Sequence, residues 1–329
     1  MRLILQLASL MLRGTALMLA LVGAAFALAC LGGVFSDRLD ALTHFAPIWL
    51  AMGLGGLGLG LVAARGPERV AIAAIALVAV LACGALMTPE LLAALGQPKP
   101  APREARQIKL VQFNLWAGND DPEATLKWIL AQDADILTLE EGGGESWPVI
   151  EGLRQAYPYS VSCDGKRYCD TWIFSRKPMV KRRGFYQDRR RVAAATAMLK
   201  DPDGNFTVVA AHYVWPLPAG RQQVQTRVMT QALKAFDPDS LIVAGDFNST
   251  PWSFSLRRQD KAFGLERRTR ALATWPTGAF SRLGTSPFPL LPIDHVYAGK
   301  AWKTVKVERG PRLGSDHRPV VVTLARAAP

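Results

Sequence analysis

The sequence predicts an α/β domain preceded by three transmembrane helices. Three uncharged apolar runs, at about 14–34, 48–64 and 70–87, fill most of the first hundred residues. After residue 106, short apolar segments of strand character alternate with segments whose apolar residues recur at helical spacing. Such alternation is typical of domains in which helices cover the faces of a sheet.

The charge of the chain lies mostly in its later part. The 329 residues include 39 basic and 27 acidic side chains, and the formal net charge is +12. Only six of the basic and four of the acidic residues precede residue 103. The later part is therefore a polar, basic domain. Its charge favours anionic partners, such as phosphate esters, nucleic acid or anionic lipid headgroups, without choosing among them.

The distribution of arginines predicts the orientation of the three spans. Each apolar run approaches the roughly 20 residues that cross a bilayer as a helix. Arg2 and Arg13 precede the first run, and Arg65 and Arg69 separate the second from the third. By the positive-inside rule, both of these segments are cytoplasmic, which places the rest of the chain outside. A cleaved signal peptide over residues 1–30 is the alternative, and the two further spans favour an anchor.

The chain therefore divides into three parts. Residues 1–96 are predicted to be the membrane anchor, 97–106 (QPKPAPREAR) a Pro-rich linker, and 107–329 the outer domain. We expect a multi-pass protein of the inner (cytoplasmic) membrane with its outer domain in the periplasm. Nothing in the sequence indicates the oligomeric state.

The outer domain is predicted to contain nine strands and three helices. Pro122 at the first helical position marks the start of the first helix, and apolar residues at helical spacing mark the last. The expected helices cover 122–131, 145–156 and 219–236. The expected strands cover 108–113, 135–139, 160–162, 171–174, 193–199, 207–211, 241–244, 293–297 and 319–324.

Polar side chains flank these strands in a repeated pattern, which is where sites gather in layered α/β folds. The clearest case is LIVAGDFNSTPW, in which Asp246 and Asn248 follow a buried strand and suit a metal-bound phosphate. An Asx-rich turn is the alternative for this stretch. The full set consists of oxygen and imidazole side chains: Asn114, Glu141, His212, Asp246, Asn248, Asp294, Asp316 and His317.

Six motifs in order resemble the endonuclease/exonuclease/phosphatase superfamily, which has the DNase I-like fold. They are QFNLW, DILTLEE, AAHY, AGDFNSTPW, PIDHVY and GSDHRPV, and they span roughly residues 107–325. The anchor and the ATWP run before PIDHVY resemble the family's membrane-tethered bacterial branch. The resemblance implies a four-layer α/β sandwich. One departure is Glu140, because the family often has Gln before the metal-binding Glu.

The resemblance also implies hydrolysis of phosphate esters with Mg²⁺ or Mn²⁺. Glu141 is the expected principal metal ligand, helped by Asn114 and Asp316, and such oxygen ligands suit Mg²⁺. Asp246 and Asn248 are expected to orient the attacking water and the phosphoryl oxygens.

The histidines complete the expected site. His317 is expected against the scissile phosphate with Asp294 fixing its tautomer. His212 is expected to bind phosphate or to protonate the leaving group. Whether His317 or Asp246 is the base stays open, and Asp170 and Tyr168 are both candidates for supporting His212.

Two further features lie outside these motifs. Cys163 and Cys169 flank a polar loop, and outside the cytoplasm they are predicted to form a disulfide. The basic runs 181–183 and 189–191 are solvated surface or contacts to lipid or substrate.

Three functions remain open at this point. The first is a membrane-anchored phosphohydrolase acting outside the cytoplasm on a lipid-linked phosphate or pyrophosphate. The second is a nuclease of the same chemistry, which would need a basic groove and stacking aromatics. The third is a catalytically inactive, tethered binding module, against which the complete set of motif residues argues.

Overall fold

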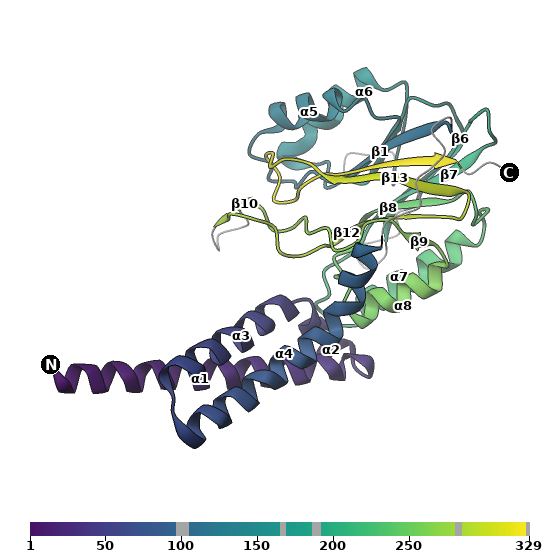
Figure 1. Cartoon of the computed structure of the whole chain (residues 1–329). Coiled ribbons are helices and arrows are strands. Elements are labelled where there is room, and N and C mark those ends of the chain that lie inside the picture. The colour runs from purple at the N-terminus through teal and green to yellow at the C-terminus, as the bar shows by residue number, and fades with distance from the viewer. Residues whose placement is uncertain (97–104, 165–168, 186–191, 280–284, 327–329) are drawn as a thin grey trace. The chain divides into compact units, whose positions relative to one another are not determined.

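The computed structural model describes residues 1–96, 105–164, 169–185, 192–279 and 285–326 (Figure 1). The chain forms two compact units. The first comprises residues 1–95 with the short segments 217–220 and 250–257, and the second comprises the remainder. The expected Pro-rich linker at 97–106 lies mostly outside the described residues.

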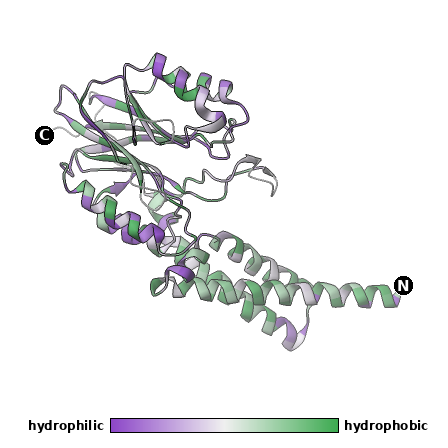
Figure 2. Cartoon of the chain, turned by 180° about the vertical axis from the view of Figure 1, so that it is seen from behind, coloured by the Kyte–Doolittle hydropathy of each residue, from purple (hydrophilic) through white to green (hydrophobic). Residues whose placement is uncertain are grey.

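Three long apolar helices make up most of the first unit. They are α1 (Arg2–Leu31), α3 (Ala46–Ala63) and α4 (Gly66–Leu95), and a 3₁₀ turn (Gly32–Val34) and α2 (Asp37–Thr43) connect the first two. Each of the three is long and apolar enough to cross a membrane, and in Figure 2 most of their residues have the green colour of hydrophobic residues. Helix α1 begins well before the expected span at 14–34, and α4 extends beyond the expected span at 70–87 at both ends.

Small residues allow these helices to approach closely. A Cβ at Gly56 of α3 would lie 2.8 Å from the backbone nitrogen of Ala20 in α1. A Cβ at Gly53 would lie 2.7 Å from the Cβ of Ala79 in α4. Glycine at these two positions therefore brings all three helices together, as small residues do between membrane helices.

The second unit contains two mixed six-stranded sheets. The first has the order β13-β14-β1-β2-β4-β3 and the second β5-β6-β7-β8-β12-β9. In each sheet one central pair is parallel, β1 with β2 and β7 with β8, and the other pairs are antiparallel. The bounds in the first sheet are β1 (Gln107–Asn114), β2 (Ile136–Glu140), β3 (Tyr159–Ser162), β4 (Trp172–Ser175), β13 (Trp302–Arg309) and β14 (Val320–Arg326). Those in the second are β5 (Met179–Phe185), β6 (Ala193–Leu199), β7 (Phe206–His212), β8 (Ile242–Asp246), β9 (Glu266–Arg267) and β12 (Asp294–Ala298).

The sheets and helices of this unit form four layers (Figure 1). Alternate residues of the central strands, such as Leu110 of β1 and Ile242 of β8, form the apolar core between the sheets. Their neighbours, such as Val111, face α5 (Pro122–Ala131) and α6 (Trp147–Ala156) on the first sheet's outer face. On the second sheet's outer face lie α7 (Arg221–Leu233) and α8 (Phe254–Phe263). There the ring of Phe263, at the end of α8, packs edge-on against the ring of Tyr297, with their centroids 5.4 Å apart. The predicted four-layer, DNase I-like sandwich is confirmed.

All the expected strands and helices are present, with ends shifted by a few residues, but several further elements are not predicted by the pattern. Two of them, β5 and β13, are edge strands that read MVKRRGF and WKTVKVER. Charged side chains on an edge protect it from pairing with other chains, and they also hide the strand from a search for apolar runs. The pattern also does not predict helix α8, which is polar, or the strands β9, β10 (Gly278–Ala279) and β11 (Thr285–Ser286), which have only two residues each.

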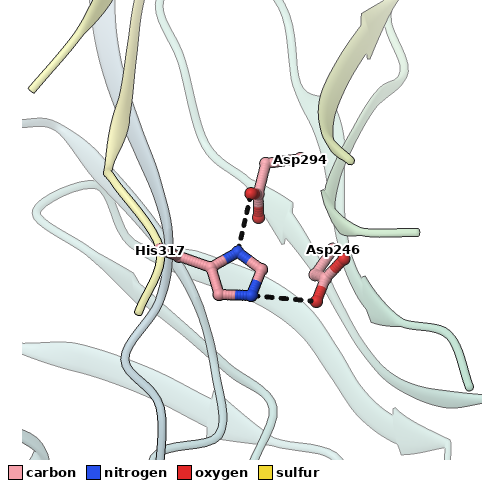
Figure 3. Close-up of side chains that lie close together, drawn as sticks. All are labelled: Asp246, Asp294 and His317. Carbon is pink, nitrogen blue, oxygen red and sulfur yellow. Dashed lines mark hydrogen bonds and ion pairs between the residues drawn. The ribbon is translucent and has the colours of Figure 1, made fainter. Parts of the chain in front are cut away.

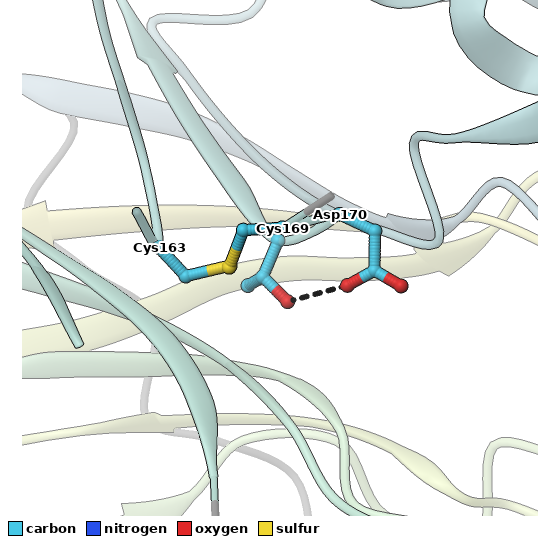
Figure 4. The surroundings of a disulfide bond; sticks show 4 residues. Cys163, Cys169 and Asp170 are labelled. Atoms are coloured by element: carbon cyan, nitrogen blue, oxygen red, sulfur yellow. Dashed lines mark hydrogen bonds between the residues drawn. A yellow bond between two sulfur atoms is a disulfide. The ribbon is translucent and has the colours of Figure 1, made fainter. Parts of the chain in front are cut away.

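The predicted disulfide between Cys163 and Cys169 is confirmed (Figure 4). It links the end of β3 to the approach to β4, and the two Cα atoms lie 5.6 Å apart. Both side chains are buried.

Replacing both Cys163 and Cys169 by serine should destabilise the protein by only about 2 kcal/mol, because the closed loop is short and its closure entropy is small. Chemical unfolding of the variant and the wild type, monitored by tryptophan fluorescence, measures this difference. Thiol labelling of the unreduced wild type should modify neither cysteine. Labelling of both would contradict the disulfide.

Candidate active site

Strand register brings the predicted polar residues to one edge of the two sheets. Asn114 at the end of β1 lies opposite Glu140 at the end of β2, directly before Glu141. In the other sheet, Asp246 at the end of β8 lies between His212 of β7 and Asp294 of β12. Parallel pairing aligns the carboxyl ends of each central pair, and the antiparallel β12 starts where β8 ends. The strand ends therefore converge.

The stretch after β8 is both an Asx turn and part of the site. The Asp246 side chain is buried, and its Oδ1 accepts a hydrogen bond from the backbone N–H of Asn248 at 2.8 Å. Its Oδ2 accepts from the amide groups of Asn114 at 3.0 Å and of Asn248 at 3.2 Å. Asn248 has a φ of 48°, in the left-handed region, and its amide also donates to the Tyr213 carbonyl at 2.9 Å. Asn248 thus holds Asp246 in place.

His317 forms a buried pair with Asp294 (Figure 3). Its Nδ1 lies 2.8 Å from Asp294 Oδ2. Because an ionised carboxylate only accepts, Nδ1 donates this bond and Nε2 faces the other way. Nε2 lies 3.8 Å from Asp246 Oδ2. The other oxygen of Asp294 accepts from the Gln112 amide at 2.8 Å. Asp294 therefore orients the imidazole so that Nε2 faces Asp246.

Glu141 lies at a strained position beside His212. Its φ is 53°, a left-handed conformation that non-glycine residues adopt mostly at functional sites. Oε1 accepts from the Asn114 amide at 3.0 Å, and Oε2 accepts from the backbone N–H of Ala117 at 3.3 Å. His212 Nε2 lies 3.7 Å from Glu141 Oε1 and 3.8 Å from Asp246 Oδ2. The two acids thus face one imidazole.

The loop before β14 brings Asp316 to the same edge. Ser315 ties this loop to β1, because its hydroxyl donates to the Asn114 carbonyl at 2.7 Å and accepts from the His317 backbone N–H at 3.0 Å. The indole N–H of Trp275 donates to Asp316 Oδ2 at 3.0 Å. Asp316 Oδ1 is buried and has no hydrogen-bond partner among the described residues.

The sequence matches the family model for the endonuclease/exonuclease/phosphatase family over residues 111–317, well over half of the chain. The chain belongs to this family. No curated protein matches the sequence. The membrane-tethered branch of the family stays a prediction.

Solved structures of the family share the fold at low sequence identity. A protein of the family from Bacteroides vulgatus is 16% identical with a TM-score of 0.56, over 68% of this chain and all (100%) of that one. A family member from Beutenbergia cavernae is 20% identical with a TM-score of 0.52, over 68% of this chain and 72% of that one. The beta toxin of Staphylococcus aureus, in a mutant form with bound magnesium ions, is 11% identical with a TM-score of 0.51, over 68% and 100%.

As a member of this family, the chain is a metal-dependent phosphoesterase. Two groups of side chains in the site are candidates for holding a divalent cation. Asp246, Asp294 and His317 offer ligand atoms that all lie within 4.8 Å of one another. The second group, Asn114, Glu141 and Asp316, is the one expected from the sequence.

The chemistry of the donors favours the second group for Mg²⁺. A cation would displace hydrogen bonds in either group, because both oxygens of Asp294 and both oxygens of Glu141 accept them. The first group, however, includes the imidazole of His317. The second group offers oxygen ligands alone, which Mg²⁺ prefers. It also contains the buried Asp316 Oδ1 that lacks a partner among the described residues. The residues present therefore fit a hard cation.

The pKa of His317 reflects its two acidic neighbours. Burial lowers it, but Asp294, by charge and hydrogen bond, and the charge of Asp246 raise it by more. The pKa of His317 therefore lies well above the ordinary value of a histidine. For Asp246, burial raises the pKa to about 6 against the lowering effect of His317. The two side chains face each other across 3.8 Å.

His212 is supported by three acids. Burial lowers its pKa, and the charges of Asp246, Glu141 and Asp170 outweigh that effect and raise it. Asp170, one of the two residues expected to support this histidine, therefore acts on it electrostatically. Tyr168, the other candidate, lies outside the described residues.

Gln112 and Glu140 belong to the site and were not predicted as functional. The Gln112 amide donates to Glu140 Oε2 at 2.9 Å and to Asp294 Oδ1 at 2.8 Å. Gln112 precedes Asn114 by two residues, so the period of a strand places both on the same face, and this signal was available in the sequence. Glu140 is fully buried, and its burial raises its pKa well above the ordinary value.

Replacing Glu140 by glutamine should leave activity and stability close to wild type. The buried carboxyl favours its neutral form, and a carboxamide has the same shape and can still accept from Gln112. Turnover of a generic phosphodiester and a thermal melt measure the two effects. A loss of turnover beyond about tenfold, on the scale of an acid–base residue, would mean that Glu140 acts as a charged group.

Proposed function

We propose that this chain is a membrane-anchored, Mg²⁺-dependent hydrolase of phosphate esters, with its catalytic domain outside the cytoplasm. The observation that carries the chemistry is the buried Asp294–His317 pair that faces Asp246, next to the acids Glu141 and Asp316. In this proposal residues 1–96 are the anchor, 97–106 the linker and 107–329 the catalytic domain.

Glu141 is the principal ligand of the cation, and Asn114 and Asp316 complete the protein's share of the site. Mn²⁺ would meet the same oxygen ligands. When bound, the cation supplies Lewis-acid stabilisation of the charge on a phosphoryl oxygen. Trp275 holds one oxygen of Asp316, which leaves the other available.

Proton transfer belongs to Asp246 and His317. Asp294 holds the Nδ1–H of His317, so its Nε2 points to the space where Asp246 Oδ2 also lies. A water in that space would meet both groups, and its proton would pass to whichever of Asp246 Oδ2 and His317 Nε2 carries no proton. Asn248 orients Asp246 and contributes a polar contact for a phosphoryl oxygen.

His212 acts on the other side of Asp246. Its Nε2 lies at nearly equal distance from Glu141 and Asp246, and its raised pKa keeps a proton available. This proton serves a phosphate oxygen or the oxygen of the leaving group. General acid catalysis of this kind contributes about 10²–10⁴-fold to a rate.

The three apolar helices support a substrate at a membrane, and we propose a lipid-linked phosphate or pyrophosphate. An anchor holds the site near the bilayer, where such a substrate is concentrated. The test is a panel assayed with the full-length protein in nonionic detergent, with Mg²⁺ and with a chelator. The panel comprises lipid pyrophosphates, phospholipids, single- and double-stranded DNA, and RNA. Cleavage of nucleic acid alone would replace the proposal by a nuclease of the same chemistry.

A reporter enzyme that works only outside the cytoplasm should be active when fused after Ala101. Arg2 and Arg13 lie near the start of the first long helix, and Arg65 and Arg69 lie where the second long helix gives way to the third, so the positive-inside rule places both of these ends in the cytoplasm. With three spans, the rest of the chain then lies on the other side of the membrane. The disulfide supports the same side, because such bonds persist in oxidising compartments. A matched fusion to a reporter that works only in the cytoplasm should be inactive, and activity there would reverse the orientation.

A further inference from the structure

A polar cavity lies away from the candidate active site, at the edges of the two sheets of the catalytic unit, where β3 and β5 are the edge strands. Its volume is about 760 Å³, and its walls come from α6, β3, β4 and β5. Arg182 of β5 donates to the Ser160 carbonyl of β3 at 3.1 Å and so connects the two edges. A Cβ at Gly184 would lie 2.1 Å from the Cys163 carbonyl oxygen, so glycine allows the strands to approach this closely.

The lining of this cavity is basic. Arg154, Arg182 and Arg183 contribute three guanidinium groups, and Asp164 is the acid among the lining residues. Within the described part of the chain, neither Arg154 nor Arg183 forms an ion pair. Guanidinium groups present paired N–H donors that match the oxygens of a phosphate. The cavity therefore favours an anion with several oxygens.

Two buried polar atoms belong to residues that line the same cavity. The Ser162 hydroxyl and the Trp172 indole N–H have no hydrogen-bond partner among the described residues, and these residues are only 3% and 6% exposed. Unpartnered buried polar atoms are costly in a folded protein. Both residues line the cavity, although the two atoms themselves have less than 1 Å² of accessible surface. Trp147 lines the cavity with Trp172 and adds aromatic surface for an organic group.

The cavity is separate from the catalytic residues but adjoins the segment that carries Glu141. Trp172 pairs with Leu139 in the first sheet, two residues before Glu141. A Cβ at Gly142 would lie 3.3 Å from the Trp172 ring. None of the eight predicted site residues lines the cavity. Because its arginines and tryptophans are grouped around one space, we propose that this cavity binds a phosphate group, apart from the ester that is hydrolysed.

The phosphate group has two sources, a free phosphate or the headgroup of a lipid phosphate, and the test separates them. Purified full-length protein in nonionic detergent with a chelator is titrated in a calorimeter with inorganic phosphate and with a short-chain phosphatidic acid. The double variant Arg154→Gln, Arg183→Gln should bind weaker by about tenfold or more, because it loses two charged contacts. Both arginines are exposed, so the fold should tolerate the change.

The matched control is Arg227→Gln with Lys303→Gln, which removes two exposed charges elsewhere on the catalytic unit and should bind as wild type. A second variant, Trp172→Phe, keeps the ring and removes the indole N–H, and it should weaken binding by a smaller factor. Tighter binding of the phosphatidic acid than of inorganic phosphate identifies a lipid headgroup, and equal binding identifies free phosphate. Equal affinity of the arginine double variant, the control and the wild type would overturn the proposal.

Hydrolysis of a generic phosphodiester with Mg²⁺, measured on the same variants, separates this proposal from the proposed function. The arginine double variant should hydrolyse it as wild type does, because its substitutions lie outside the catalytic residues. Absence of hydrolysis by the wild type would count against the catalytic proposal alone, since the binding comparison is made without metal.

Discussion

Replacing His317 by alanine should lower turnover by about 10²–10⁴-fold and leave the affinity for Mg²⁺ near wild type. The imidazole is held by Asp294 at Nδ1 and faces Asp246 from Nε2, so its loss removes a proton-transfer and phosphate contact. It is not among the oxygen ligands that suit the cation. Steady-state kinetics at saturating Mg²⁺ and calorimetric titration with Mg²⁺ measure the two quantities separately, and added metal should not restore the rate.

The control for this variant is the conservative Asp294→Asn, which keeps the imidazole and weakens its orientation. It should reduce turnover less than His317→Ala, with unchanged Mg²⁺ affinity. Loss of metal binding by His317→Ala would place the histidine in the metal site, in line with the close grouping of Asp246, Asp294 and His317. If His317→Ala kept activity within about tenfold of wild type, His317 would have no part in the chemical step.

Much of the site follows from the sequence because strand ends are visible as changes from apolar to polar residues. The run LIVAG ends at Asp246 and DILTL ends at the glutamate pair, and parallel pairing then aligns these ends with His212 and Asn114. The eight predicted residues gather at this edge of the two sheets. Their assignment to metal or to proton transfer depends on which atoms are already engaged, and the sequence carries no such information.

Other features are hidden from the sequence for physical reasons. The edge strand β5 contains three consecutive basic residues, and four of the eight residues of β13 are charged, so neither strand forms an apolar run. Gln112 bonds both to Glu140 and to Asp294, which lies 182 positions after Gln112 in the chain, and only the packing of the two sheets creates this second contact. The arginine-lined cavity likewise joins β3 and β5, which belong to different sheets.

Replacing Glu141 by glutamine should weaken Mg²⁺ binding by about tenfold or more, and part of the lost activity should return at high Mg²⁺ concentration. A carboxamide keeps the size of the side chain and can still accept from the Asn114 amide, but it loses the charge that a hard cation requires. The loss of this charge is large in proportion, because the remaining ligands Asn114 and Asp316 carry one formal charge between them. Turnover measured across a range of Mg²⁺ concentrations, together with calorimetry, gives both effects.

The adjacent residue supplies a matched control for this prediction. Glu140→Gln makes the same substitution one position earlier, where the carboxyl group is fully buried, favours its neutral form and is bonded to Gln112. It should bind Mg²⁺ as wild type does, whereas Glu141→Gln should not. Equal weakening in both variants would point to a general loss of negative charge at the end of β2. An unchanged Mg²⁺ affinity in Glu141→Gln, with turnover lost at every metal concentration, would instead make Glu141 a partner of His212 in the chemistry, since their side chains lie 3.7 Å apart.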